Sequence, residues 1–190
     1  LGSKYPQLQG TYGKAKPLFF SDFFSQQYIL GYYFPFSMEA NYNSNIYITN
    51  LPVTICHELA HTKGFLREDE ANFLAYLACM ESKEELFQYS GYLSVLNYVD
   101  SDFYKELGNN KKEYLKFPQI LEQVRSDDIF IQADIWERIE KEAILPTDLL
   151  QSASNTFTDT TLRLNGVQEG VQSYSYVVKL LLQYYDGILY

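Results

Sequence analysis

Two histidines and a glutamate form the stretch of this chain whose residue types and spacing point most directly to a chemistry. Both histidines lie in the pattern His57-Glu58-x-x-His61, within "ICHELAHTKGFLREDEANFLAYL". Residues four apart share one face of an α-helix, so His57 and His61 can bind the same ion. Neutral imidazoles are good ligands for zinc. Glu58 is rotated by about 100° from His57 around the helix, so it would flank the metal as a general base.

The alternative is a chance match on an ordinary helix, which we expect in roughly one chain of this size in a hundred. The residues around the pair argue against it. Leu59, Ala60 and Thr62 are uncharged, so most sides of this helix should be buried. Buried histidine and glutamate side chains without partners destabilise a fold by several kcal/mol, and metal coordination removes that loss. The sequence therefore predicts a Zn2+ site.

A catalytic zinc site needs a third protein ligand and an open fourth position. In the pattern H-E-x-x-H-x-x-G-x-x-H, Gly64 matches the glycine, but Arg67 occupies the last ligand position. Arginine cannot bind zinc because it stays protonated. The carboxylates of the following stretch remain as candidates: Glu68, Asp69 and Glu70. Their clustering also suits the positive end of a helix dipole, a role that is compatible with metal binding.

"HELAH" followed by "EDEANF" resembles the gluzincin superfamily of metallopeptidases, in which a second helix supplies a glutamate. The resemblance implies that Glu68 is the third ligand. It also implies that Asn72, one turn later, holds a metal-binding histidine. Glu70 would then point elsewhere, into a cap or a salt bridge. The connection from His61 to Glu68 is shorter than in most gluzincins, so Glu70 stays open as the alternative ligand.

A wider resemblance covers nearly the whole chain. The blocks that carry it are "GYYFPFSMEANYN", "HELAH", "EDEANFLAYLAC", "YSGYL" and "GVQSYSYVVKLLL". They resemble an uncharacterised family of bacterial membrane proteins, in which N-terminal transmembrane helices precede a zincin-like domain. This implies that the full-length protein is membrane-anchored through segments outside this chain, on a side of the membrane that the resemblance leaves open. Within the chain, the charge-free run 23–37 is too short and too polar to cross a bilayer.

The function we expect is that of a zinc-dependent peptidase acting on a peptide or protein substrate. Zinc held by His57, His61 and Glu68 would lower the pKa of its water to about 7. Glu58 would take the proton and pass it to the leaving amine. One alternative is a catalytically silent zincin-like module that serves as a sensor or in assembly at the membrane. Another is a hydrolase of a non-peptide amide, such as a cell-wall fragment.

The chain has no third histidine to stabilise an oxyanion, so a tyrosine or an arginine must supply that donor if a side chain does. Tyr174 is our candidate catalytic residue, with Tyr176 as the alternative. With 18 tyrosines in the chain, each is more often a core or rim residue.

Zincins commonly bind substrate along an edge strand that precedes the active helix. By resemblance, the stretch from "YYFPF" to "NIYI" is our candidate, and Pro35 fits an edge strand. A plain structural strand is the alternative. Glu39, Asn41 and Asn43 would line the cleft or shape a turn, and the turn is favoured.

Composition limits the class of protein. The 190 residues suit a single domain, 1–190, and 46% hydrophobic with 21% charged residues is ordinary for a globular protein. A net charge of -9 argues against nucleic-acid binding. Cys56 and Cys79 are too few for a disulfide framework, so buried free thiols are expected, with one bridge between neighbouring helices as the alternative.

The predicted fold is α+β and mainly α, with strands and loops in 1–50 and helices in 51–190. A helix capped by Asn50 should end at Gly64, and a second should begin near Glu68. A third should begin with a capping box at Ser82–Glu85. Further helices are expected over 118–144 with a break at 126–128, over 146–164, and in "YSYVVKLLLQYY" after a turn at 165–166.

Overall fold

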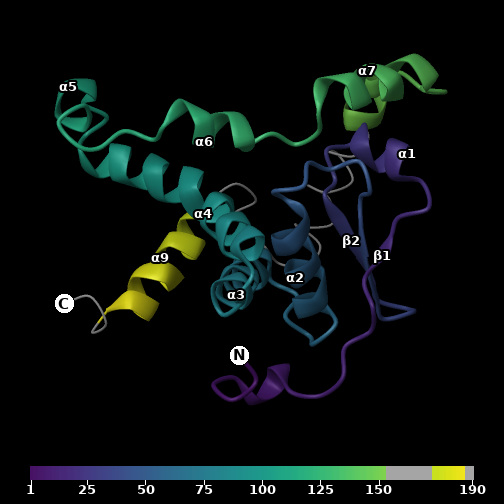
Figure 1. The fold of residues 1–190 in the computed structure, drawn as a ribbon, viewed down its shortest axis with the longest axis horizontal. Coiled ribbons are helices and arrows are strands. Elements are labelled where there is room, and N and C mark those ends of the chain that lie inside the picture. Colours follow the sequence, from purple (N-terminus) through teal and green to yellow (C-terminus); the bar gives the residue numbers. More distant parts are fainter. Residues whose placement is uncertain (153–172, 187–190) are drawn as a thin grey trace.

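The computed structural model describes residues 1–152 and 173–186 and shows the predicted α+β fold, mainly helical with a small sheet (Figure 1). The N-terminal part holds a 3-10 turn, three strands and one short helix: η1 (Pro6–Leu8), β1 (Lys16–Pro17), α1 (Ser21–Ser25), β2 (Gly31–Phe34) and β3 (Glu39–Tyr42). The remaining elements are helices: α2 (Leu51–His61), α3 (Glu68–Met80), α4 (Glu85–Glu106), α5 (Lys111–Tyr114), α6 (Glu122–Asp127), α7 (Ala133–Glu142) and α9 (Ser173–Tyr185).

The sheet has the strand order β1-β3-β2, so β2 is an edge strand. β1 runs parallel to β3, and β2 pairs antiparallel with it from Gly31 opposite Tyr42 to Phe34 opposite Glu39. The predicted edge strand in "YYFPF" is therefore confirmed for its first three residues, and Pro35 lies in the turn that follows.

The extended continuation predicted at "NIYI" is wrong. Residues 44–50 form turns and bends. The backbone N–H of Asn45 donates to Asn43 Oδ1 at 3.0 Å, and that of Tyr47 donates to the Phe130 carbonyl at 2.8 Å. These partners take up the donors that a sheet ladder would need. Helix α1, which the sequence did not predict, occupies part of the region expected to be strands.

Helices α2 and α3 form the predicted helix-turn-helix. Pro52 stands in the first turn of α2, where its missing N–H leaves no bond unmade. Gly64 follows α2 with φ +88°, a left-handed conformation that favours glycine. Ala60 and Ala71 are buried where the helices meet, together with Leu74 and with Leu8 from η1. Small side chains on both helices let the two backbones approach closely.

Asn50 stands at the predicted N-cap position of α2, but neither predicted N-terminal cap forms its side-chain hydrogen bond. The Asn50 side chain makes no cap bond to α2, because its amide donates instead to the Ile129 carbonyl at 2.7 Å. Helix α4 begins at Glu85 rather than after Ser82, and the Ser82 hydroxyl accepts from the backbone N–H of Glu84 at 3.1 Å. Ser82 therefore shapes the turn before α4 and does not form a capping box.

The main apolar core lies between α3, α4 and α9. Its buried members are Phe73, Tyr76, Leu77, Val95, Val177 and Leu181. The final predicted helix is thus confirmed as α9, and it packs on the back of the helix that carries Glu68. Within residues 1–152 and 173–186, no helix is both long and apolar enough to cross a membrane.

The helices expected over 118–144 appear as α6 and α7, separated at 128–132, close to the predicted break. Residues 147–152 are helical. The rest of the helix predicted to reach 164, and the turn predicted at 165–166, lie outside the described residues.

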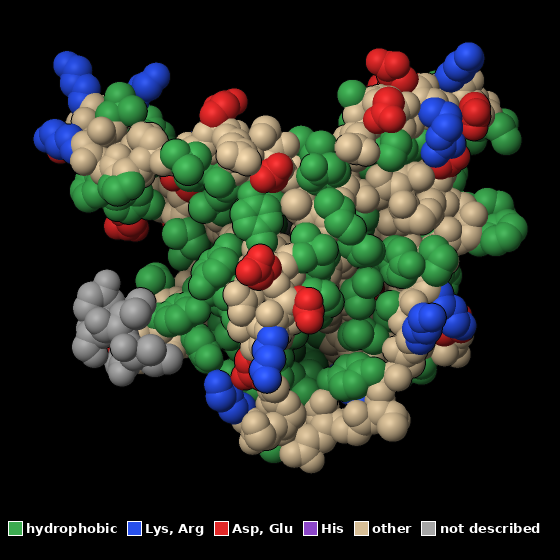
Figure 2. All heavy atoms as spheres, in the orientation of Figure 1, with side chains coloured by type: hydrophobic (Ala, Val, Ile, Leu, Met, Phe, Trp, Pro, Cys, Tyr) green, Lys and Arg blue, Asp and Glu red, His purple; other side chains and the backbone are tan. Residues whose placement is uncertain are grey.

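Hydrophobic side chains spread across the middle of the face drawn in Figure 2. In the sheet region several large aromatic side chains are exposed to solvent: Phe19, Phe20, Tyr32, Phe34 and Phe36. Tyr32 and Phe34 stand on the edge strand with ring centroids 4.7 Å apart. Grouped apolar exposure of this kind is typical of a surface that contacts another molecule.

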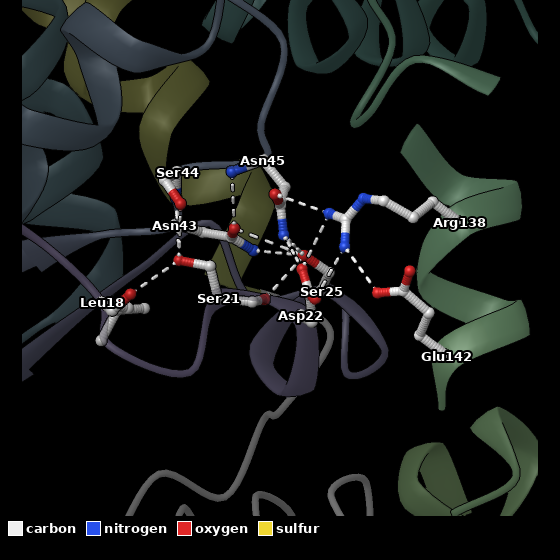
Figure 3. Close-up of polar contacts among 9 residues, drawn as sticks. All are labelled: Leu18, Ser21, Asp22, Ser25, Asn43, Ser44, Asn45, Arg138 and Glu142. Atoms are coloured by element: carbon white, nitrogen blue, oxygen red, sulfur yellow. Dashed lines mark hydrogen bonds and ion pairs between the residues drawn. The ribbon is translucent and has the colours of Figure 1, made fainter. Parts of the chain in front are cut away.

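A polar network joins α1 to the loop after β3 (Figure 3). Asn43 is fully buried, and its side-chain amide donates to Ser25 Oγ and to the Ile29 carbonyl, both at 2.9 Å. Further out, the Asn45 amide donates to Asp22 Oδ1 at 2.7 Å, and the Arg138 guanidinium of α7 donates to both Asp22 oxygens at 2.9 and 3.0 Å. The network anchors the sheet region to α7.

We expect Asn43→Ala to lower the free energy of unfolding by about 1 to 3 kcal/mol, because buried partners at Ser25 and Ile29 lose their hydrogen bonds. Arg138→Ala is the matched control. Its ion pair with Asp22 is solvent-exposed, so its loss should stay below about 1 kcal/mol. Urea unfolding followed by circular dichroism measures both. Equal losses in the two variants would contradict the assigned roles.

Candidate metal centre

Two histidines from α2 and one glutamate from α3 converge on a single point. The Nε2 atoms of His57 and His61 lie 2.9 Å apart. The Glu68 carboxylate reaches across the turn, with Oε2 3.1 Å from His57 Nε2 and Oε1 3.7 Å from His61 Nε2. Among the residues that the structure describes, this is the group whose histidine, cysteine and acidic donors all lie within 4.8 Å of one another.

The chemistry of these donors fits zinc. His61 Nδ1 lies 2.7 Å from the Phe65 carbonyl, which can only accept, so Nδ1 carries the proton and Nε2 presents its lone pair. The His57 ring is turned 88° from the His61 ring, and the Asn72 side chain is the smallest of the influences that raise the His57 pKa. Two imidazole nitrogens and a carboxylate oxygen are the donor set of many catalytic zinc sites, and the Phe65 carbonyl fixes the orientation of the His61 ring.

The site is closed on one side and open on the other. The His57 and His61 side chains are 15% and 9% exposed, whereas the Glu68 side chain is 59% exposed. A metal held here would be backed by α2 and would face solvent beside Glu68. This leaves room for a further ligand, as a catalytic site requires.

Glu58 lies beside the three metal donors but is not one of them. Its side chain is 5% exposed and packs against the backbone of the edge strand. A Cβ atom built on Gly31 would come within 2.6 Å of Glu58 Oε1, so a side chain at this first residue of β2 would displace the Glu58 carboxyl. Burial raises the pKa of Glu58 to about 7, against the opposing charge of His57 and with a further increase from Glu68.

Charge within the cluster is shared unequally. Burial favours neutral His57, but the hydrogen bond to Glu68 and the charges of Glu68 and Glu58 outweigh it and raise the His57 pKa. Burial and the His57 charge lower the pKa of His61. Burial alone would raise the pKa of Glu68. The hydrogen bond to His57 and the positive charge of His57 outweigh burial, so the Glu68 pKa is lowered. The cluster therefore keeps a carboxylate at Glu68 and a neutral imidazole at His61.

The other residues of the acidic stretch lie away from the histidines. Arg67 donates from Nε and Nη2 to both Asp69 oxygens, at 3.1 and 2.8 Å. Glu70 Oε1 lies 3.7 Å from Arg67 Nε, in the kind of salt bridge that was expected for it. The structure thus brings Glu68, and not Glu70, to His57 and His61.

The predicted tyrosines stand at the start of α9. The backbone of Tyr174 is helical, and its side chain lies outside what the structure describes. Tyr176 lies near Arg67. The hydrogen bond and charge of Asp69, followed by weaker effects that include Tyr176, raise the Arg67 pKa.

The polar residues expected to line a cleft or shape a turn have structural roles. Glu39 pairs with Lys16 across the β1–β3 ladder. The Asn41 amide donates to the Tyr32 carbonyl at 3.3 Å, between β3 and β2. Asn43 is buried in the polar network described above. The favoured turn interpretation holds for Asn43, whose side chain accepts from the N–H of Asn45.

Sequence reasoning missed three contributors to this site: Gly31, Tyr33 and Phe65. The Tyr33 ring stacks on His61 with centroids 6.0 Å apart. The alternation of a strand places Gly31 and Tyr33 on one face, which the "GYYF" pattern would have indicated. Phe65 acts through its backbone carbonyl, so its residue type carries no signal of that role.

Cys56 and Cys79 are free thiols on α2 and α3, as expected. The neighbouring Cys79 lowers the pKa of Cys56, whereas Cys56 and burial raise the pKa of Cys79.

Residues 1–182 match the profile of a family described as "Protein of unknown function (DUF3810)". The match spans nearly the whole chain, and the chain belongs to this family. No curated protein and no solved structure matches it. The expected membership in an uncharacterised family is thereby confirmed, while the gluzincin resemblance and the metal remain hypotheses.

Glu68→Gln should weaken zinc binding by more than about 100-fold, because loss of a ligand should exceed the 10- to 100-fold effect typical of a residue that orients a ligand. Asn72→Ala should weaken zinc binding by about 10- to 100-fold. Glu70→Gln, the matched control on the same helix turn, should bind zinc like the wild type. Competition with a chromophoric chelator measures all three, and a Glu70→Gln loss as large as that of Glu68→Gln would contradict the ligand assignment.

The raised pKa of Glu58 makes the stability of the metal-free protein depend on pH. A carboxyl whose folded pKa is raised from 4.5 to about 7 stabilises the fold below pH 4.5, and this contribution is lost as the pH rises through 7. The stability of the wild type relative to Glu58→Gln should therefore fall across this range, by about 3 kcal/mol in order of magnitude. Denaturant unfolding in chelator at several pH values measures it. A difference independent of pH would contradict the burial of this carboxyl.

Proposed function

We propose that this DUF3810 protein is a zinc-dependent peptidase related to the gluzincins, with zinc bound by His57, His61 and Glu68. The observation that carries the proposal is the convergence of these three donors next to a buried carboxyl, Glu58, with a pKa of about 7. Nothing in an ordinary helix pair requires this combination. A structural role alone would favour paired or apolar side chains in place of three electron-rich donors.

Glu58 is suited to acid-base work at neutral pH. A group with a pKa near the operating pH is populated in both forms, so it can accept a proton and later release it. Its position one residue after His57 places it beside the ligands. When bound, zinc would supply Lewis-acid chemistry, activating water and polarising a carbonyl. Glu58 would accept the proton from the attacking water and deliver it to the leaving amine.

The residues around the donors maintain the geometry that such a site needs. The Phe65 carbonyl fixes the tautomer of His61, and Asn72, one turn after Glu68 on α3, would hold the ring of His57. Neither residue would touch substrate. Their part is to keep two nitrogen lone pairs aimed at one point while Glu68 closes the third side.

The edge strand supports a peptide as substrate. Among the described residues, β2 pairs with β3 on one side only, and its first residue, Gly31, lies directly on Glu58. An extended chain added along β2 would therefore pass close to Glu58 and the donor cluster. The exposed aromatic rings of Tyr32 and Phe34 on this strand offer apolar contacts to alternate side chains of such a chain.

We further propose that the peptidase works at a membrane, through segments outside this chain. This part of the proposal rests on the family resemblance of the sequence blocks given above. It is consistent with a substrate that is itself a membrane or membrane-associated protein.

Glu58→Gln should keep stoichiometric zinc and lose peptide hydrolysis by about 100-fold to 10,000-fold, the range that general acid-base catalysis supplies. Glu70→Gln, which leaves the cluster intact, is the control and should retain turnover. The assay combines elemental analysis with mass spectrometry of a broad peptide library that includes membrane-protein segments.

Unchanged turnover in Glu58→Gln would refute the mechanism. Stoichiometric zinc without cleavage of any substrate would instead favour the silent sensor or assembly module. Absence of bound zinc in protein purified without chelators would overturn the metal assignment and the peptidase together.

A further inference from the structure

The inner face of the edge strand touches the candidate metal centre at two places. The first and third residues of β2, Gly31 and Tyr33, are partly buried, and the strand packs against α2 (Figure 1). Gly31 lies on the Glu58 side chain. The Tyr33 ring lies against the ring of His61, with centroids 6.0 Å apart and planes inclined by 30°. The position of Tyr33 therefore bears directly on a proposed metal ligand.

The hydroxyl of Tyr33 connects this contact to the surface of the molecule. It donates a hydrogen bond to the thioether sulfur of Met38, with an Oη–Sδ distance of 2.8 Å. Phe34 and Glu39 are paired in the β2–β3 ladder, so Met38 is the last residue of the turn that joins the two strands. A thioether sulfur is a weak acceptor. The chemical state of this one sulfur thus decides what the Tyr33 hydroxyl binds.

Met38 differs in access from Met80, the other methionine of the chain. Met38 is 56% exposed. Met80 packs against the main apolar core, and α4 covers its end, since a Cβ atom on Gly91 would lie 2.7 Å from Met80 Cε. A reagent from solvent therefore reaches the Met38 sulfur more readily. Met80 provides an internal control for that difference.

We propose that Met38 is a site of reversible oxidation, and that its conversion to the sulfoxide moves Tyr33 relative to His61. The oxidant belongs to the class of hydroperoxides. The movement of Tyr33 depends on neither zinc nor peptidase activity. Its consequence for metal binding rests on the zinc site proposed above.

The reaction transfers one oxygen atom to sulfur. A lone pair of the Met38 sulfur attacks one oxygen of hydrogen peroxide, so that an S–O bond forms and the O–O bond breaks. The departing hydroxide takes the proton from the oxygen now bound to sulfur and leaves as water. The sulfur is oxidised by two electrons, and the peroxide is reduced to water. Tyr33 occupies one of the two sulfur lone pairs, and the other remains for this attack.

The sulfoxide offers Tyr33 a different acceptor. Its oxygen is more polar than the thioether sulfur and stands away from the sulfur position, so the Tyr33 hydroxyl leaves Sδ to follow it. The ring then shifts from its place against His61, while the Phe65 carbonyl still bonds His61 Nδ1. Zinc affinity should fall by about 10-fold, the lower limit for residues that orient a ligand.

The test records the ring carbon–proton NMR spectrum of the metal-free chain at fixed pH, before and after limited treatment with hydrogen peroxide. The chain has two histidines, so their ring signals can be followed separately. A thiol reductant added after the peroxide returns oxidised cysteines to thiols and leaves methionine sulfoxide in place. Peptide mapping should find one added oxygen on Met38 before Met80 is modified, and the His61 signal should shift. Methionine sulfoxide reductases A and B, added together with a reductant, should restore the signal.

Three variants assign the shift to the Met38–Tyr33 contact. Met38→Leu conserves the volume and keeps both cysteines but has no sulfur at this position, so peroxide should leave its His61 signal in place. Tyr33→Phe keeps the ring and loses the hydroxyl. Its Met38 should still be oxidised, but its His61 signal should not follow. Met80→Leu, the matched control on α3, should respond like the wild type.

Oxidation of Met80 as fast as that of Met38, or a His61 signal that stays fixed when Met38 is fully oxidised, would overturn the proposal. An equal shift in Met38→Leu or Tyr33→Phe would do the same. Competition with a chromophoric chelator then compares the zinc affinity of the reduced and oxidised chains. Equal affinities would contradict the consequence for the metal site. A chain that binds no zinc in either state would refute the zinc assignment, while a shifted His61 signal would still support the movement of Tyr33.

Discussion

The close approach of α2 and α3 is the constraint on which the rest of the structure depends. Two imidazole nitrogens 2.9 Å apart cannot both present lone pairs to each other unless a proton or a metal ion lies between them, and the Glu68 carboxylate beside them adds negative charge. Burial of Ala60, Ala71 and Leu74 holds the helices at this separation. Apolar packing thus holds together a set of donors that would repel one another without a cation.

The N-terminal sheet completes the arrangement from the other side. β2 lies so close to α2 that Gly31 packs on the Glu58 side chain and keeps water from it. The resulting rise in the Glu58 pKa is therefore a property of the contact between sheet and helix, and not of the HExxH pattern itself. The polar network around Asn43 holds the loop that joins β3 to α2 (Figure 3). The hydrogen bond from the Tyr47 N–H to the Phe130 carbonyl holds the same loop further along. Contacts far from the metal donors thus fix the position of the Glu58 carboxyl.

Sequence reasoning predicted the helices well and their ends less well. The spacing of His57 and His61, the glycine at 64 and the acidic start at Glu68 predicted the helix-turn-helix, because local propensity and tertiary packing agree there. Asn50 and Ser82 are residue types that often cap helices. However, the Asn50 amide donates to the distant Ile129 carbonyl, and the Ser82 hydroxyl accepts from the Glu84 N–H in the turn before α4. Spacing alone did not decide whether Glu68 or Glu70 is the third metal ligand, because the short turn after α2 determines which carboxylate points toward the histidines. The strand alternation indicates that Gly31 and Tyr33 share a face, but the approach of Gly31 to Glu58 joins segments far apart in the sequence, and Phe65 acts through a backbone atom. No local pattern encodes either contact.

The central claim is that His57, His61 and Glu68 hold zinc. Its most direct test is an anomalous diffraction map, recorded at the zinc absorption edge, of crystals of the chain loaded with one equivalent of zinc. We predict one strong peak bounded by the two Nε2 atoms and the Glu68 carboxylate, at zinc–ligand distances of about 2.0 to 2.2 Å. A peak coordinated by Cys56 or Glu70, or no ordered peak in protein that carries stoichiometric zinc, would contradict the account.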